Sequence, residues 1–375
     1  MKILIFHFYP LERFPPVMNL LQVLGNEIDH NTRVYVFSVY PPPEYQLFIP
    51  DNKQIIIKRI AKNDANTFVI KRYFNYLRYN FVSILWGLWL RPDKLVYYES
   101  ISALAPLLLK KYFFRKKGLF IHYHEYMEPA DYKAMYLSDL FHRFEMKNYE
   151  LAEWISHTNQ YRMNMFLDDI NGHQLRNTYI YPNFPPANWK SKSNKLVIDK
   201  PVRLVYVGSF GSMQAIYVTE ILEWIKSQQG QYTFDIYSFN ITDEIRNYIE
   251  ALDCADITVH AQVNYYDLPK VLRQYHVGLI LYKGGSRNVE MCASNKLFEY
   301  LACGLDVWYS KDMEGTWVYD SPVEWPKVIR LDFTRMNSYN FSELLLHMPD
   351  AHRTTDYTAE SASRDLVLRL KKASL

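Results

Sequence analysis

The chain has 375 residues, 49% of them hydrophobic and 22% charged, which is the composition of a globular protein long enough for two buried cores. Its formal net charge of +3 is too small to predict a nucleic-acid partner. Its three cysteines include no close pair, so neither disulfide bonds nor a zinc site is expected. The first apolar stretch, 3–6, is too short for a signal peptide, and the longest uncharged apolar run, 81–90, falls far short of the roughly 20 residues of a membrane span. We therefore expect a cytoplasmic protein.

The first half of the chain alternates between predicted strands and helices. Strands are predicted over 2–8, 32–39, 54–60, 94–98 and 119–124, helices over 17–24 (ended by Gly25), 67–90 and 101–114, a long helical region over 131–167, and a further strand over 178–181. Such alternation predicts a parallel sheet covered by helices, whose ligands bind beyond the carboxyl ends of the strands. Functional side chains are therefore expected in the loops after Phe8, Tyr98 and His124.

A second half of the same kind follows residues 182–200, which begin with several prolines and continue with Ser, Asn and Lys residues, as linkers do. Strands are predicted over 202–207, 233–238, 257–260 and 277–282, and helices over 215–227, 242–252 and 266–275. The tail 359–372 is amphipathic and basic. The sequence thus predicts an α/β protein with two parallel-sheet domains.

The segment from Ser294 to Val307 predicts a short helix with a binding site at its start. Apolar residues recur with helical spacing at 297, 298, 301 and 302, and Gly304 is placed to end the helix in a left-handed cap. Lys296 and Glu299 share one side of the helix start, where free N–H groups and the helix dipole favour an anion. The pair suits a sugar nucleotide, with the diphosphate on Lys296 and the ribose hydroxyls on Glu299. An amphipathic helix with an ordinary i,i+3 ion pair is the alternative, and spacing alone does not decide between them.

The loop Gly208-Ser209-Phe210-Gly211 follows a predicted strand and precedes a helix. Glycines there let backbone amides approach a diphosphate, although a merely tight connection uses the same residues. The next three residues, 212–214, carry no charge, so the counter-charge is expected from Lys283, Arg287 and Lys296. Arg287 lies just after a predicted strand, where a guanidinium can clamp a phosphate at two points; a solvated surface arginine is the alternative.

Three segments resemble, in the expected order, bacterial retaining glycosyltransferases of family 4, which have the GT-B fold. The run SNKLFEYLACGLDV (294–307) is similar to their donor-site helix, which often reads Pro-Asn-Lys-Leu-x-Glu-Tyr-Leu-Ala-x-Gly-x-Pro-Val. The run LVYVGSFG (204–211) resembles the strand and glycine loop that open the donor domain, and NTYIYPNFPP (177–186) resembles the segment that closes the acceptor domain.

This resemblance implies two Rossmann-like domains facing across a cleft: an acceptor domain over 1–186, onto which the helix in 356–375 packs back, and a donor domain over 198–355. It implies transfer of a hexose-type sugar from a UDP- or GDP-linked donor to a glycan or lipid-linked acceptor in cell-surface polysaccharide synthesis. Transfer is expected to proceed with retention, without a metal and with no cofactor besides the nucleotide-sugar co-substrate. The residues implied in donor binding are Gly208, Ser209, Phe210, Gly211, Arg287, Ser294, Asn295, Lys296, Leu297 and Glu299.

In the first domain the run HYHEYME (122–128) follows a predicted strand. Members of the family carry near this point a histidine that contacts the donor sugar, and His124 or Glu125 resembles it. With Lys296, these two residues are the expected catalytic residues. A zinc site at His122 and His124 lacks further ligands at suitable spacing, and a histidine that only fills space beside tyrosines is the alternative.

The chain departs from the family pattern at several positions. Ser294 and Asp306 replace two prolines, and the first of the family's two glutamates falls at Met291, with Glu290 displaced by one position. A catalytically degenerate relative that binds sugar nucleotides or glycans is therefore the alternative function. Nicotinamide oxidoreductases, P-loop NTPases and metal-dependent glycosyltransferases are excluded because the chain contains no Gly-x-Gly, Gly-Lys-Ser/Thr or Asp-x-Asp.

Two stretches of the first half, KRYFNYLRY (71–79) and KKYFFRKK (110–117), mix cations with aromatic rings. Such stretches suit a lipid headgroup boundary, although many helices of soluble proteins look similar. Since the family often uses lipid-linked acceptors, we expect peripheral contact with the inner, cytoplasmic face of the membrane.

Overall fold

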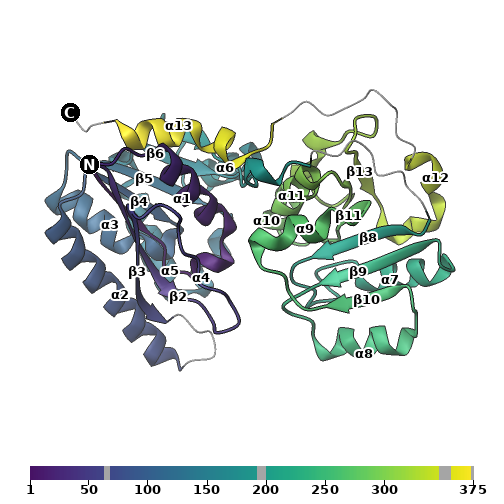
Figure 1. Cartoon of the computed structure of the whole chain (residues 1–375). Helices are drawn as coiled ribbons and strands as arrows, with labels where there is room; N and C mark the ends of the chain where they lie inside the picture. The colour runs from purple at the N-terminus through teal and green to yellow at the C-terminus, as the bar shows by residue number, and fades with distance from the viewer. Residues whose placement is uncertain (63–67, 192–199, 346–355, 373–375) are drawn as a thin grey trace. The chain divides into compact units, whose positions relative to one another are not determined.

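The computed structural model describes residues 1–62, 68–191, 200–345 and 356–372, which form two compact units. The first unit comprises Met1–Asn183 and Thr358–Leu375, and the second comprises Phe184–Tyr357. Each unit is built around one sheet whose strands all run parallel (Figure 1).

The sheet of the first unit has seven strands in the order β3-β2-β1-β4-β5-β6-β7. The residues from Ile3 to Phe6 are fully buried, as expected for a central parallel strand covered on both faces. The strands are β1 (Lys2–Phe6), β2 (Arg33–Tyr40), β3 (Ile55–Lys62), β4 (Lys94–Tyr98), β5 (Gly118–Tyr123), β6 (Trp154–His157) and β7 (Thr178–Ile180).

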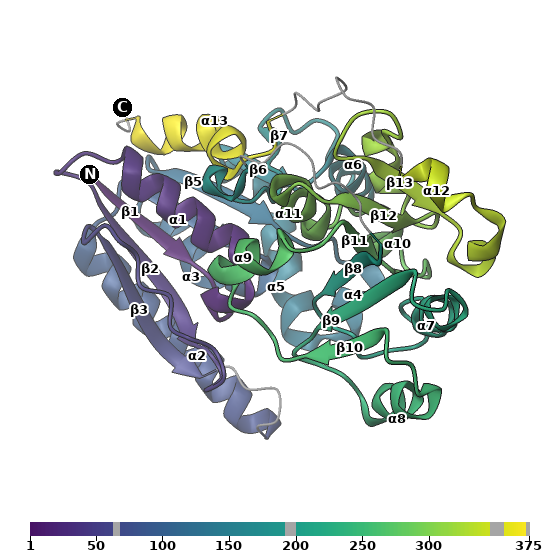
Figure 2. The same cartoon turned by 45° about the vertical axis from the view of Figure 1, so that its right-hand side comes forward.

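Helices cover both faces of this sheet (Figure 2). The apolar side chains of α2, α3, α5 and α6 share one core with the sheet, whereas α13, at the end of the chain, packs against α1. Arg369 of α13 lies over the rings of Trp154 and Tyr179, at 5.7 and 4.7 Å from their centroids. The helices are η1 (Leu11–Arg13), α1 (Pro15–Glu27), α2 (Val69–Leu90), η2 (Ser100–Ser102), α3 (Leu104–Leu108), the π-helical turn η3 (Leu109–Phe113), α4 (Pro129–Ala134), α5 (Tyr136–Met146), η4 (Tyr149–Leu151), α6 (Gln160–Asp169) and α13 (Ala359–Lys371).

The second unit has a six-stranded sheet in the order β10-β9-β8-β11-β12-β13. Its strands are β8 (Val202–Val207), β9 (Tyr232–Tyr237), β10 (Ile257–His260), β11 (Val277–Ile280), β12 (Asp306–Ser310) and β13 (Val328–Leu331). Its helices are η5 (Ala187–Trp189), α7 (Val218–Ser227), α8 (Asp243–Leu252), η6 (Tyr265–Asp267), α9 (Leu268–Leu272), α10 (Arg287–Glu290), α11 (Asn295–Cys303), η7 (Glu314–Tyr319), η8 (Phe333–Ser338) and α12 (Phe341–Leu344). The order places β8 and β11 at the centre, so the loops that follow them lie at the same sheet edge.

Two expectations about local structure are wrong. The region 131–167 is not one long helical stretch, because β6 lies within it between α5 and α6. All four residues of β6 are buried, so the strand shows no period-2 alternation that separates it from a buried helical segment. The first helix, α1, also runs through Gly25 to Glu27, since one glycine costs a helix only about 1 kcal/mol.

Candidate functional site

In the loop after β8, residues 208–211, two of the four backbone N–H groups form hydrogen bonds within the fold. Gly208 has a φ of +129°, a conformation that side chains rarely allow. Its N–H donates to a carbonyl at the end of β9 at 2.9 Å, and the N–H of Phe210 donates to the carbonyl of Asn240 at 3.0 Å. In the described part of the chain, no partner accepts from the N–H groups of Ser209 and Gly211. These two amides are therefore the loop's available donors for an anionic ligand.

Lys296 extends from the first turn of α11 to the glycine loop. A Cβ on Gly208 would lie 2.9 Å from the Lys296 Cε, so a larger residue would crowd the lysine. The Nζ of Lys296 donates to the phenol oxygen of Tyr282 at 2.7 Å and lies over the Tyr206 ring, 5.3 Å from its centroid. Burial lowers the pKa of Lys296, but the surrounding phenol oxygens outweigh it and raise the pKa above its ordinary value. The ammonium thus stays charged at neutral pH, with donor capacity left for a phosphate.

Glu299 lies one turn further along α11 and is only 8% exposed. Burial raises the pKa of its carboxyl to about 7, although the Lys296 charge acts in the opposite direction. Among the described residues, Glu299 forms no ion pair, because the Lys296 ammonium is directed to Tyr282 instead. Glu299 is therefore a buried carboxyl that changes charge near neutral pH, as binding-site groups often do.

The position of α11 is fixed by a close contact between Tyr300 and β11. A Cβ on Gly278 would lie 2.2 Å from the Tyr300 ring, so the ring rests directly on the glycine backbone. The Tyr300 hydroxyl accepts the N–H of Val207, the last residue of β8, at 3.1 Å. This seating holds the helix start beside the glycine loop, and hence Lys296 beside Gly208.

The side chain at the N-cap position of α11 leaves the first backbone N–H groups of the helix without a cap. Ser294 occupies the N-cap position with extended backbone, but its side chain makes no hydrogen bond to the first turn. The N–H groups of Asn295 and Lys296 find no acceptor within the described ranges, and thus are open to an anion. Leu297 is fully buried and its N–H donates to the Ser294 carbonyl, so Leu297 supports the helix rather than facing a ligand.

The segment around Met291 is held in place from both sides. Arg287 begins α10 and is exposed, and the Glu290 carboxylate accepts the N–H of Gly285 at 3.0 Å. A Cβ on Gly315 would lie 2.2 Å from the Met291 carbonyl oxygen, so the backbone here is tightly packed. Met291 occupies the position at which the family resemblance expects a glutamate. The carboxylate of its neighbour, Glu290, is bound to the Gly285 N–H and is not free to replace it.

Lys283 is engaged away from the helix start. Its Nζ lies 3.1 Å from the carboxylate of Glu220 and donates to the carbonyl of Met213 at 3.1 Å. Of the three expected counter-charges, Lys296 is the one that adjoins the glycine loop through a contact with Gly208.

In the first unit, four buried histidines gather at the carboxyl ends of β1, β5 and β6. The ring centroids of His122 and His124 are 4.6 Å apart, and those of His7 and His124 are 6.5 Å apart. Burial lowers the pKa of His7 and His157 to about 3 and that of His124 to about 4, and it lowers the pKa of His122 as well. Nε2 of all four rings is buried without a hydrogen-bond partner among the described residues. The rings are therefore neutral, with unused hydrogen-bonding capacity.

Glu99 anchors the backbone of His124. Its carboxylate accepts the His124 N–H at 2.7 Å. Glu99 has a φ of +60° and a ψ of 149°, which a residue with a side chain adopts at a cost of about 1–3 kcal/mol. Burial raises the pKa of Glu99 to about 8, although the bond from the His124 N–H opposes the shift. The strained backbone of Glu99 at the end of β4 holds the backbone of His124 in place at a cost in local stability, as is common at functional sites.

Glu125 is held by Arg162, a residue that the sequence did not single out. The guanidinium of Arg162, on α6, donates to the Glu125 carboxylate at 2.8 Å and to the His124 carbonyl at 2.7 Å. Arg162 is only 5% exposed, and an arginine between Tyr161 and Met163 carries no recognisable signal of burial in the sequence. One buried side chain thus holds both the carboxylate of Glu125 and the backbone of its neighbour His124.

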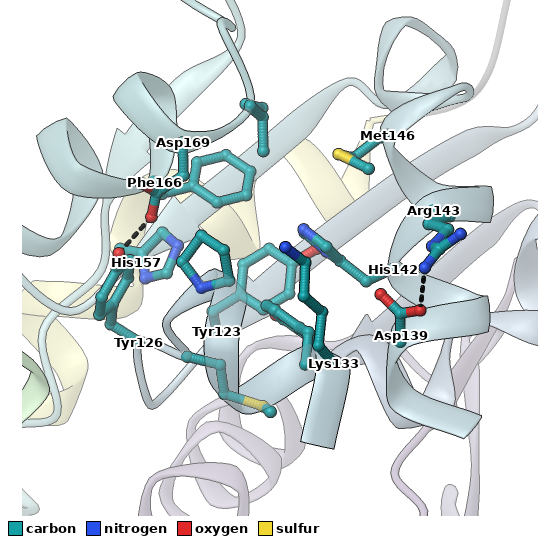
Figure 3. A pocket seen from close by; sticks show the side chains of 14 residues that line it. Tyr123, Tyr126, Lys133, Asp139, His142, Arg143, Met146, His157, Phe166 and Asp169 are labelled. Carbon is teal, nitrogen blue, oxygen red and sulfur yellow. Dashed lines mark hydrogen bonds and ion pairs between the residues drawn. The ribbon is translucent and has the colours of Figure 1, made fainter. Parts of the chain in front are cut away.

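A cavity of about 230 Å³ lies in the first unit beyond the ends of β5 and β6 (Figure 3). His157 lines it beside Tyr126, whose hydroxyl donates to the Asp169 carboxylate. The stacked rings of Tyr132 and His142 also line it, with centroids 3.9 Å apart. The full lining is Tyr123, Tyr126, Met127, Pro129, Tyr132, Lys133, Asp139, His142, Arg143, Met146, His157, Phe166, Asp169 and Ile170.

Within the described ranges, no three His, Cys, Asp or Glu side chains come together in a way that would hold a metal ion. None of the described helices combines the length and the apolar character needed to cross a bilayer.

No family model and no curated protein sequence matches the chain. Solved structures do match along its whole length. A glycosyltransferase from Rickettsia africae is 12% identical, with a TM-score of 0.67, covering 99% of this chain and 97% of the other. HepE from Anabaena, in complex with UDP and glucose, is 10% identical with a TM-score of 0.64, covering 99% of both chains. The UDP-GlcNAc 2-epimerase of Neisseria meningitidis, bound to UDP-GlcNAc, is 12% identical with a TM-score of 0.58, again over 99% of both.

The two parallel-sheet, Rossmann-like units and these similar structures together establish the GT-B fold for this chain. At such low identity the similarity concerns the fold, and the reaction must be argued from the chain's own residues.

Proposed function

We propose that the protein is a glycosyltransferase that takes a hexose-type sugar from a UDP- or GDP-linked donor, with retention and without a metal. The observation that carries this proposal is the arrangement of Lys296, Glu299 and the open N–H groups around the start of α11. A partly buried cation, a carboxyl one helical turn away and unpaired amides match the diphosphate and the ribose of a nucleotide.

In this proposal the protein mainly positions the donor and stabilises its leaving group. Lys296 and the amides of Ser209 and Gly211 bind the diphosphate, and they bind it more tightly as negative charge develops on it. Glu299 accepts hydrogen bonds from the ribose hydroxyls. The leaving phosphate takes the proton of the acceptor hydroxyl, so no separate protein base is needed. Arg287 and the Ser294–Asn295 turn contribute further donor contacts.

His124 and Glu125 are the proposed catalytic residues of the first unit, to be tested by their effect on turnover. The neutral His124 ring has an unpaired Nε2 that can bond a sugar hydroxyl. Arg162 is a positioning residue, because it acts through its bonds to both of them.

The acceptor is proposed to be a glycan or a lipid-linked saccharide at the cytoplasmic face of the membrane. The cavity beside His157 is its candidate binding place, since aromatic walls suit the apolar faces of sugar rings. Lys133 and the unpaired nitrogens of His157 add polar contacts for hydroxyls or phosphate.

A catalytically degenerate sugar-nucleotide or glycan binder is the second candidate, and Met291 favours it. The carboxylate next to it, Glu290, is tied to Gly285 and the backbone is packed on Gly315, so no glutamate easily replaces the missing one.

Incubation with UDP- and GDP-linked hexoses, with and without glycan and lipid-linked acceptors, separates these possibilities. A transferase releases nucleoside diphosphate and forms a glycosylated product only when an acceptor is present. An epimerase returns an altered sugar nucleotide, and a binding protein changes its melting temperature with nucleotide but forms no product. Melting-temperature shifts without turnover for any pair would rule out the transferase.

A further inference from the structure

One face of α2 presents large apolar side chains to the outside of the first unit. Six of them, spaced at three or four residues over five turns, are between 50% and 84% exposed: Ile70, Phe74, Leu77, Phe81, Leu85 and Trp89. The opposite face carries Tyr76 and Tyr79, which are almost fully buried in the core. Single exposed apolar residues are normal, but a continuous row along a 22-residue helix calls for a partner.

The charged residues of α2 itself are all positive. Lys71, Arg72 and Arg78 are exposed on α2, and Arg91 follows its end. The sequence contains no Asp or Glu from 65 to 92. The partner of the α2 face must therefore accept apolar side chains and carry negative charge around them.

The basic turn after α3 extends the same surface. α2 and the π-helical turn η3 touch closely, since a Cβ on Gly87 would lie 2.4 Å from the Leu109 side chain, and Figures 1 and 2 both draw α2 beside α3. Tyr112 and Phe113 of η3 are each 57% exposed, and Arg115 and Lys116, which follow them, are exposed as well. Lys110 is buried and Lys117 pairs with Asp93, so these two lysines add little to the surface.

We propose that α2 and η3 form a docking surface for an anionic lipid bilayer. In this arrangement α2 lies parallel to the membrane, with its apolar row at the boundary between headgroups and acyl chains and its cations on lipid phosphates. A second copy of this chain fits the surface less well, because two such faces would bring cation against cation. This inference rests on α2 and not on the proposed transfer reaction, so each can fail without the other.

Sedimentation with phosphatidylcholine vesicles, with and without phosphatidylglycerol, tests the proposal on the full chain. The protein should bind the anionic vesicles, bind neutral ones far less and dissociate as salt is raised. The double variant Phe74→Glu/Phe81→Glu should lower the partition coefficient about a hundredfold, since each lost apolar side chain costs about tenfold. Leu368→Glu, at a side chain 55% exposed on α13, is the matched control and should bind as the wild type does.

Two further measurements keep the outcome unambiguous. The emission of the wild type should shift to the blue on vesicles, and Trp89→Phe should lose most of that shift, because Trp89 lies in the apolar row. The double variant and the wild type should have the same melting temperature in the presence of UDP or GDP. Equal values would indicate that the substitutions leave the fold and the nucleotide site intact. Equal vesicle binding by wild type and double variant would overturn the proposal, as would a dimer that the double variant dissociates.

Discussion

The ammonium of Lys296 and the phenol oxygen of Tyr282 are joined by a hydrogen bond of 2.7 Å beside the glycine loop. This bond turns the lysine away from Glu299 and toward Gly208, although the three-residue spacing brings Lys296 and Glu299 to the same side of α11. The consequence is a cation held over the loop and a carboxyl without an ion-pair partner among the described residues, which is the arrangement that the proposed nucleotide site requires.

Lys296→Ala should weaken the binding of UDP or GDP by about 1.5–3 kcal/mol, because a charge-assisted contact with the diphosphate is lost. Isothermal titration calorimetry measures the change directly. Lys270→Ala is the control, because Lys270 is exposed and pairs with Asp267 on the surface. Equal losses in the two variants would mean that Lys296 contributes only general positive charge.

Glu299→Gln should raise the donor KM and reduce turnover, since glutamine accepts ribose hydroxyls less strongly than a carboxylate. The affinity of the wild type for nucleotide should increase as the pH rises from 6 to 8, because the pKa of Glu299 is about 7 and the ionised form is the better acceptor. In Glu299→Gln this pH dependence should disappear. A variant with wild-type kinetics at every pH would remove Glu299 from the site.

Gly278→Ala should destabilise the second unit and weaken nucleotide binding. The added Cβ would lie 2.2 Å from the Tyr300 ring, and relief requires α11 to move away from β11. Overpacking of this kind costs about 1–3 kcal/mol, to be measured by urea unfolding. Gly284→Ala makes a suitable comparison, because its nearest contact would be the end of the Glu290 side chain at 3.2 Å, well beyond 2.2 Å. If the two substitutions cost the same, the contact of Tyr300 with Gly278 does not seat the helix.

The buried histidines should make the first unit sensitive to acid. The pKa of His157 falls to about 3 in the fold, below the ordinary 6.5, so the folded state binds fewer protons than the unfolded state between these values. This contribution to stability is complete above pH 6.5 and is lost as the pH falls, by about 1.4 kcal/mol per pH unit for one such group.

His157→Phe keeps the stacking on Tyr123 and removes the titrating ring. Its free energy of unfolding should therefore fall less steeply below pH 6 than that of the wild type, in urea titrations at several pH values. His30→Gln, at an exposed histidine, should leave the slope unchanged. Parallel curves for wild type and His157→Phe would show that His157 is not held neutral by burial.

The sequence predicts α11 well, because its determinants are local. The apolar spacing from Leu297 to Leu301 gives the helix, and Gly304, with a φ of +84°, ends it as expected. The direction of Lys296 cannot be predicted from the sequence, because it depends on the hydrogen bond to Tyr282. Tyr282 is in turn held by an antiparallel bridge to Ile216, which is far away in the sequence.

In the first unit, the sequence located the histidine run but neither the strain at Glu99 nor the role of Arg162. Both depend on contacts between strands and helices more than twenty residues apart, which no periodicity records. The α2 surface was only partly anticipated. Its second half, with Phe81 and Trp89, is apolar on both faces, so the exposed row cannot be told from the buried one by composition.

A crystal structure of the protein with UDP or GDP bound tests the central claim most directly. The account predicts the diphosphate within hydrogen-bonding distance of the Lys296 Nζ and of the first amides of α11, with the ribose hydroxyls on Glu299. A nucleotide bound elsewhere in the chain, with the Lys296–Tyr282 pair undisturbed and Glu299 out of contact, would contradict it.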